Sequence, residues 1–165
     1  KYPTRPSYRD DMLLSIDVSN DSRTIIFWAI YTTGNPEDNG LWLCKWDIQS
    51  GNTEKICEFP YGYLRWKTNE IIWNPIPEKQ LIAVMIEKDI YIVDARQKKI
   101  IKKISGISYN YKDYVYKRSS IHWSPDGSLL YILDSGKKLR CYEPSTGKLS
   151  EILPRCSFTD FFFIK

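Results

Sequence analysis

The stretch that decides the fold reads Ile121-His122-Trp123-Ser124-Pro125-Asp126-Gly127-Ser128 and continues into Leu129-Leu130-Tyr131-Ile132-Leu133. Both apolar runs have the aromatic and β-branched composition that is typical of strands. Between them, Pro125 fixes φ at the first position of a turn, and Asp126 and Gly127 close a tight loop. The stretch therefore predicts a β-hairpin.

Two further strands follow this hairpin. The run Asp134-Ser135-Gly136 predicts a turn into a strand over residues 139–143, and Pro144-Ser145-Thr146-Gly147 predicts another turn before a strand over residues 148–153. The third strand ends in an acidic residue, Glu143. The unit is thus four short strands joined by turns.

The same unit is written twice more upstream. In the middle copy, Ile71-Ile72-Trp73-Asn74-Pro75 precedes strands predicted over residues 81–86, 90–94 and 100–104. In the first copy, residues 16–22 precede strands predicted over 24–30, 41–47 and 53–59. Trp73 and Trp123 lie 50 positions apart, and Val18 and Trp73 lie 55 apart. A repeat of about 40 to 50 residues with four strands has the spacing of a β-propeller blade.

A family resemblance rests on the residues of these turns. Trp123-Ser124-Pro125-Asp126-Gly127-Ser128, with Trp73-Asn74-Pro75 as a degenerate copy, resembles the turn of WD40-like repeats in TolB-type propellers and in the propellers of prolyl-oligopeptidase relatives. The resemblance covers roughly residues 13–153. In the first copy Asn20-Asp21-Ser22 replaces the Pro-Asp-Gly motif.

The chain is predicted to be a single all-β domain over residues 1–165, with β-propeller-like repeats at about 13–60, 70–106 and 120–154. Rings of blades usually contain about 4 to 8. Three blades leave two apolar sheet faces without a neighbour, so we expect either half of a six-bladed ring shared with a second copy or part of a longer propeller. Residues 155–165 are apolar and predicted as a ring-closing strand.

Composition excludes several classes of protein. The 165 residues are 42% hydrophobic and 27% charged, which is ordinary for a globular chain and excludes wholesale disorder. The longest uninterrupted apolar run, Leu81 to Ile86, is far shorter than the roughly 20 residues of a membrane-spanning helix. With 12 Tyr and 6 Trp against a single His, the chain favours a β-rich binding scaffold over a histidine-driven enzyme.

The cysteines predict neither a metal site nor a disulfide framework. Cys44, Cys57, Cys141 and Cys156 form no CxxC pair and have no histidine cluster near them, so a tetrahedral zinc site is disfavoured. Their oxidation state stays open. No cofactor is predicted, and the start of the chain at Lys1 assigns it no compartment.

Candidate binding residues lie in the connections from the fourth strand of one repeat to the first strand of the next. In a propeller these connections lie on one face. Both are aromatic and basic, a composition enriched at protein-binding hot spots. The predicted partner-binding residues are Tyr61, Tyr63, Arg65, Trp66, Tyr109, Tyr111, Tyr114, Tyr116 and Arg118.

The predicted function is a non-catalytic scaffold for protein–protein interaction. Two alternatives stay open: the propeller part of a larger hydrolase that resembles the prolyl-oligopeptidase group, and a nucleic-acid-binding module that stacks bases on its aromatic residues. A net charge of +4 is modest for the second. No catalytic motif is found, and His122 is predicted to be structural, so we expect no enzyme activity.

Overall fold

The computed structural model of the chain describes residues 15–31, 40–60, 70–86, 88–107, 120–134 and 138–153. These residues form three four-stranded antiparallel sheets, each made of consecutive strands.

We call the sheets blades 1, 2 and 3 in sequence order. Blade 1 contains β1 (Ile16–Val18), β2 (Thr24–Tyr31), β3 (Gly40–Asp47) and β4 (Thr53–Pro60). Blade 2 contains β5 (Glu70–Trp73), β6 (Leu81–Ile86), β7 (Asp89–Asp94) and β8 (Lys99–Ile104), with a short 3-10 helix at Pro77–Lys79. Blade 3 contains β9 (Ser120–Trp123), β10 (Leu130–Asp134), β11 (Lys138–Glu143) and β12 (Lys148–Leu153).

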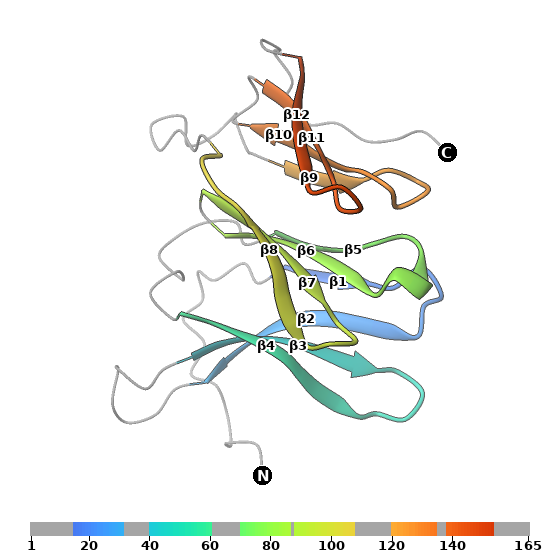
Figure 1. Ribbon diagram of the computed structural model, residues 1–165. Coiled ribbons are helices and arrows are strands. Elements are labelled where there is room, and N and C mark those ends of the chain that lie inside the picture. Colours follow the sequence, from blue (N-terminus) through green and yellow to red (C-terminus); the bar gives the residue numbers. More distant parts are fainter. Residues whose placement is uncertain are drawn as a thin grey trace.

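The blades are stacked face to face in sequence order, with blade 2 in the middle (Figure 1). The first strands lie side by side, β1 against β5 and β5 against β9. One apolar core lies between blades 1 and 2 and includes Ile26, Trp28 and Tyr91. A second core lies between blades 2 and 3 and includes Met85, Ile92 and Trp123. The all-β architecture of about three propeller-like blades is therefore confirmed, and no described strand closes the stack into a ring.

The repeats match in detail as well as in strand count. In every blade the pairing of the third strand with the fourth shifts register at one point, at Leu43/Cys44, Ile92/Val93 and Leu139/Arg140. The acidic residue that ends each third strand caps the following turn. The carboxylate of Asp47 accepts a hydrogen bond from the Ser50 amide at 2.7 Å, and that of Asp94 accepts one from the Gln97 amide at 2.7 Å. Glu143 accepts one from the Thr146 hydroxyl at 2.6 Å.

The turn that identified the repeat forms in blade 1 as well, although its sequence differs there. In blade 3 the Ser124 hydroxyl donates to Asp126 Oδ1 at 2.5 Å and accepts a hydrogen bond from the Leu129 amide at 3.0 Å. In blade 1 Ser19 makes the same two contacts, with Asp21 at 2.6 Å and with the Thr24 amide at 2.9 Å. The serine and the aspartate therefore specify this turn, and Pro-Asp-Gly is not required for it.

The Asp126 carboxylate should make stability depend on acid pH. Hydrogen bonds from the Ser124 hydroxyl and from the Ser128 amide and hydroxyl lower the pKa of Asp126 to about 2. A depressed pKa stabilises the fold above the unfolded pKa of 3.8, and this contribution is lost as pH falls towards about 2. The wild-type chain should therefore melt at a higher temperature than Asp126→Asn at neutral pH. The gap should shrink between about pH 4 and pH 2 in thermal melts. A gap that stays constant with pH would contradict a role for the charge.

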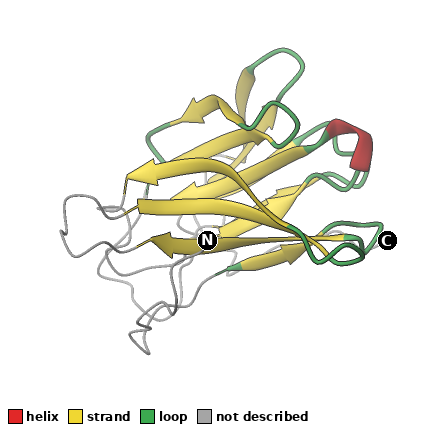
Figure 2. Cartoon of the chain, turned by 90° about the horizontal axis from the view of Figure 1, so that it is seen from below, coloured by secondary structure: helices red, strands yellow, loops and turns green. Residues whose placement is uncertain are grey.

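The described turns and the other strand ends lie at opposite ends of the stack (Figure 2). The turns that join β1 to β2, and β3 to β4, lie at one end together with their counterparts in blades 2 and 3. The opposite end carries the strand ends at Pro60, Glu70, Ile104 and Ser120. The strand β8 is exposed from Lys99 to Lys103, as expected for a lysine-rich outer edge. Among the described residues, no helix is long and apolar enough to cross a membrane.

Candidate functional site

The predicted binding residues cannot be placed on the fold. Residues 61–69 and 108–119, which include all nine of them, lie outside the described residues. The structure does place the strand ends that flank both segments at the same end of the stack (Figure 2). A binding surface made by these aromatic and basic residues therefore stays a prediction.

Side chains of one blade hold the first strand of the next. Asp17 Oδ2 accepts a hydrogen bond from the Trp73 amide at 2.7 Å, and the Ser15 hydroxyl accepts one from the Ile71 amide at 3.2 Å. One blade further on, Glu70 accepts a hydrogen bond from the Ile121 amide at 3.2 Å. When Val18, Trp73 and Trp123 are aligned, Ser15 and Glu70 fall at the same position, and so do Ile71 and Ile121. The contact of blade 1 with blade 2 and that of blade 2 with blade 3 therefore use equivalent positions of the repeat.

Asp17 combines burial with these hydrogen bonds. Partial burial raises the pKa of its carboxyl group, while hydrogen bonds from the Trp73 and Val18 amides act in the opposite direction. The carboxylate lies between the first strands of blades 1 and 2, where it accepts a backbone donor across the interface. Its role is to join the two blades.

A second link between blades lies at the turn end. Asn20 Nδ2 donates to the Pro75 carbonyl at 2.7 Å, and Asn74 Nδ2 donates to the Gly127 carbonyl at 2.9 Å. Lys79 Nζ also donates to the Asp126 carbonyl at 3.1 Å. At the turn end, each pair of neighbouring blades is therefore joined by an asparagine side chain that donates a hydrogen bond to the next blade.

The repeat geometry shows which sheet face has no neighbouring blade among the described residues. We call the side of a blade that faces the preceding blade its rear face, and the opposite side its forward face. The registers make the rear-face positions equivalent, because Ile16, Ile71 and Ile121 pair with Phe27, Val84 and Ile132. In blades 2 and 3 these positions are covered by the preceding blade, and Ile71 and Ile121 are 1% and 0% exposed. In blade 1 the equivalent Ile16 is 64% exposed.

The rear face of blade 1 is apolar over β1 to β3 and is exposed at Ile16, Val18 and Trp46, whereas Cys44 on the same face is 4% exposed. Val18 is 44% exposed where its counterparts Trp73 and Trp123 are buried, and Trp46 is 38% exposed. Alternation along β1, β2 and β3 places eight residues on this face, Ile16, Val18, Ile25, Phe27, Ala29, Trp42, Cys44 and Trp46. Apolar side chains that are buried in two repeats and exposed in the third mark a surface that suits a partner.

The edge of this face carries a small polar rim. Lys55 Nζ lies 4.3 Å from the centre of the Trp42 ring and pairs with Glu58 at 2.6 Å. Burial raises the pKa of the Cys44 thiol to about 11, so this cysteine stays protonated at neutral pH and contributes as an apolar group. An apolar centre with a charged edge is the usual composition of a protein interface.

The sequence predicted two apolar sheet faces without a neighbour. The second of these would be the forward face of blade 3, and it differs from that prediction. His122, Tyr131 and Cys141 lie on it, since Tyr131 pairs with both of the others and alternates with core residues. They are only partly buried, whereas Leu133 on the same face is 0% exposed. The two ends of the stack are therefore not equivalent, and the apolar docking candidate is at blade 1.

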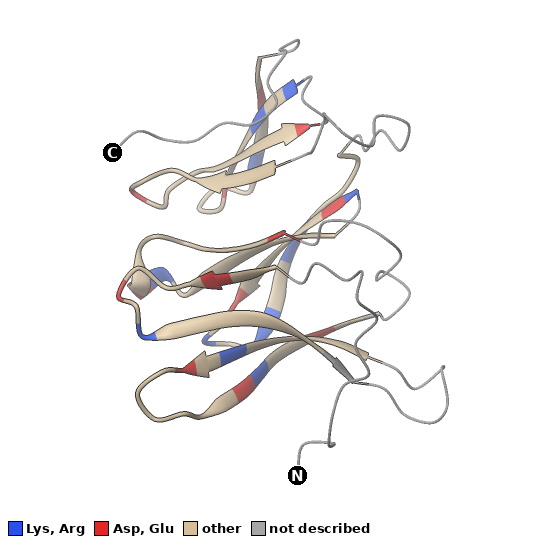
Figure 3. Cartoon of the chain, turned by 180° about the vertical axis from the view of Figure 1, so that it is seen from behind, with Lys and Arg blue, Asp and Glu red and all other residues tan. Residues whose placement is uncertain are grey.

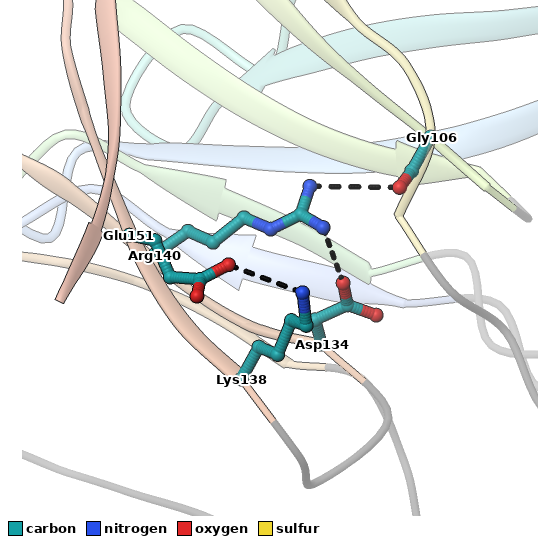
Figure 4. Close-up of polar contacts among 5 residues, drawn as sticks. All are labelled: Gly106, Asp134, Lys138, Arg140 and Glu151. Atoms are coloured by element: carbon teal, nitrogen blue, oxygen red, sulfur yellow. Dashed lines mark hydrogen bonds and ion pairs between the residues drawn. The ribbon is translucent and has the colours of Figure 1, made fainter. Parts of the chain in front are cut away.

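A buried ion pair lies at the interface of blades 2 and 3 (Figure 4). Asp134, which ends β10, is 1% exposed and accepts Arg140 Nη2 at 2.9 Å. Arg140 Nη1 also lies 3.5 Å from the carbonyl of Gly106, which belongs to the segment after β8. The pair joins two strands of blade 3 and points its guanidinium towards blade 2. This arrangement fits a structural role, in which the ion pair holds blade 3 against blade 2.

The described surface carries both signs of charge. Acidic and basic residues are interspersed over the strands of all three blades (Figure 3). Two of the lysines near β8 are paired, Lys98 with Glu54 and Lys103 with Asp89.

Sequence reasoning named loops as the candidate site and did not identify the residues of the open rear face. The available signal was the alternation in β1 to β3, where apolar residues occupy both faces of the first sheet in the sequence. Within the described part of the chain, no three His, Cys, Asp or Glu side chains are grouped so that they could hold a metal ion.

Comparison with known proteins adds no family to these observations. No protein-family description matches the sequence. A search of curated proteins likewise finds no match to this chain.

Proposed function

We propose that this chain is a non-catalytic scaffold of the β-propeller type that binds another protein through the open rear face of blade 1. The observation that carries the proposal is the exposure of Ile16 and Val18 at positions whose counterparts are buried in blades 2 and 3. Exposed apolar area of this kind is unfavourable in water, and a partner that covers it gains roughly 25 cal/mol for each Å² removed from solvent.

The repeat geometry supports one kind of partner. Each covered rear face packs against the forward face of another four-stranded blade, as in the two cores of this chain. A partner blade for blade 1 would come from a second copy of the chain or from further repeats of a longer propeller, the arrangement implied by the resemblance to WD40-like repeats of the TolB type. The aromatic and basic segments around Trp66 and Tyr114 remain a proposed second contact surface.

Light scattering over a dilution series tests the second copy as the partner. The expected result is a mass near twice 19.5 kDa that falls on dilution. Val18→Lys places a charge on the exposed first strand of the open face and should raise the dissociation constant of the dimer by at least about tenfold. Ile101→Lys is the matched control, because Ile101 is 45% exposed on the outer strand β8 and Val18 is 44% exposed.

Two outcomes would contradict the proposal. A mass of 19.5 kDa at every concentration would exclude the second copy as partner. A large loss of thermal stability in Val18→Lys, without the same loss in Ile101→Lys, would show that the open face supports the fold of the chain itself and is no docking surface.

A further inference from the structure

A cavity of about 270 Å³ lies at the turn end between blades 1 and 2. Its walls come from strands β2 to β4 and their turn in blade 1, and from two residues of blade 2, Trp73 and Gln80. The volume is slightly below the range of about 300 to 1,000 Å³ that drug-sized ligands occupy. The lining residues are Thr24, Lys45, Asp47, Ser50, Asn52, Glu54, Trp73 and Gln80.

Lys45 makes the cavity polar, although the equivalent position of blade 2 holds an apolar residue. Lys45 pairs with Ile26, and at the equivalent position of blade 2 Ile92 pairs with Ala83. Ile92 is 0% exposed in the core between blades 2 and 3. At the interface of blades 1 and 2 the position instead holds an ammonium group, which pairs with Glu54 at 2.7 Å.

The second observation is a buried donor on Trp73, one of the residues that line the cavity. The Trp73 side chain is 9% exposed, and its indole Nε1 is buried without a hydrogen-bond partner among the described residues. Its counterpart Trp123 directs Nε1 towards the Ile72 carbonyl at 3.5 Å, in the preceding blade. A buried polar group without a partner is uncommon in a folded protein and calls for a water or a ligand.

The cavity is lined by one cation, Lys45, and two carboxylates, Asp47 and Glu54, and Lys98 outside the lining supplies the second cation. Glu54 also pairs with Lys98, and the two lysines lower the pKa of the Glu54 carboxyl group. Lys45 and Lys98 are thus matched by Glu54 and Asp47, so that these four charged groups at the cavity sum to zero, which favours an uncharged ligand. The Ser50 amide and hydroxyl fix the Asp47 carboxylate, each at 2.7 Å, and lower its pKa.

We propose that this cavity binds an uncharged, hydroxyl-rich molecule of monosaccharide size. Hydroxyl groups both donate and accept hydrogen bonds, and the wall offers partners of both kinds: the carboxylates accept, whereas the lysine and the indole Nε1 donate. The Trp73 ring adds an apolar wall for the carbon atoms of such a ligand. The proposal is independent of the docking face, which lies on the opposite side of blade 1.

Nuclear magnetic resonance of the six indole N–H groups gives a direct test. The probes are glucose, galactose and mannose, with acetate and phosphate as charged comparisons. The Trp73 resonance, assigned by its absence in Trp73→Phe, should shift and saturate with a dissociation constant of about 1 mM, which is usual for a small polar ligand. The Trp123 resonance should not move.

Variants separate the site from general effects. Trp73→Phe keeps an aromatic ring, removes the donor and should weaken binding about tenfold. The matched control Trp123→Phe should bind sugar like the wild type. Lys45→Ile recreates the side chain found at this position in blade 2 and should abolish binding while the chain remains folded.

The proposal is overturned if no sugar moves the Trp73 resonance at about 100 mM, a hundred times the expected dissociation constant. It is also overturned if Trp73 and Trp123 shift alike, or if only acetate or phosphate produces the shift. Saturable binding that survives Lys45→Ile would place the ligand elsewhere on the chain and contradict this site.

Discussion

Gly127→Ala should destabilise the chain by about 3 kcal/mol, because it introduces both a backbone strain and a steric clash. Gly127 has a φ of +62°, a left-handed conformation that alanine adopts only at a cost. A Cβ atom built there would lie 2.1 Å from Asn74 Oδ1 and 3.0 Å from its Nδ2. The clash therefore falls on the amide that joins blade 2 to blade 3 through the Gly127 carbonyl.

Thermal unfolding checks this prediction. A loss of about 3 kcal/mol corresponds to a decrease in Tm of about 6 to 12 °C for a chain of this size. Gly147→Ala is the matched control, since Gly147 has a φ of +72° but no atom within 4 Å of a built Cβ. It should lose only the backbone part, about 1 kcal/mol.

A double variant isolates the clash from the strain. Asn74→Ala removes the obstructing amide, so that Gly127→Ala should cost less in that background than in the wild type. Equal losses in Gly127→Ala and Gly147→Ala, or strict additivity with Asn74→Ala, would show that the close approach between blades 2 and 3 does not limit stability.

Asp134→Ala should cost about 3 to 5 kcal/mol, because it leaves the Arg140 guanidinium without its partner at the interface of blades 2 and 3. Asp134 is 1% exposed, and the Arg140 side chain is 18% exposed. Desolvation makes the loss of one partner of such a pair far more costly than the loss of a surface pair. Chemical denaturation should show the loss as a lower midpoint with an unchanged slope.

The neighbouring ion pair provides the control for this experiment. Lys138 and Glu151 lie 3.2 Å apart on the adjacent strands and are 43% and 39% exposed (Figure 4). Glu151→Ala should cost no more than about 0.5 kcal/mol, as is usual for an exposed pair. The double variant Asp134→Leu with Arg140→Met should recover much of the loss, since an apolar pair needs no compensation for charge. A small effect of Asp134→Ala would contradict this structural role.

The strands of this chain could be predicted from local signals. Alternating apolar residues and Gly- or Asp-containing turns marked all the strands of the repeats to within about two residues, because the features that form a hairpin lie close together in the sequence. The serine and aspartate of the turns, as in Ser124 and Asp126, are likewise part of the repeated sequence pattern. Even the weak first repeat formed the expected turn, because Ser19 and Asp21 supply the same hydrogen bonds.

The contacts between blades could not be predicted in the same way. Asp17 accepts the amide of Trp73, 56 positions away, and Asn74 reaches the carbonyl of Gly127, 53 positions away. Alternation tells which residues share a face of one sheet, but it does not tell which face meets the next sheet or where along the strand the contact falls. The bare face at Ile16 and the orphaned Trp73 indole are therefore properties of the three-dimensional arrangement alone.

The sequence by itself determined the secondary structure and the number of blades. Only the tertiary structure decided that blade 1 carries the open apolar face, that Asp134 and Arg140 are buried together, and that Lys45 and Trp73 line one cavity. The physical reason is the separation along the sequence between the residues that interact. Turn and strand preferences depend on residues a few positions apart. The stacking of blades buries side chains from distant repeats against one another, and no local sequence pattern shows which of them meet.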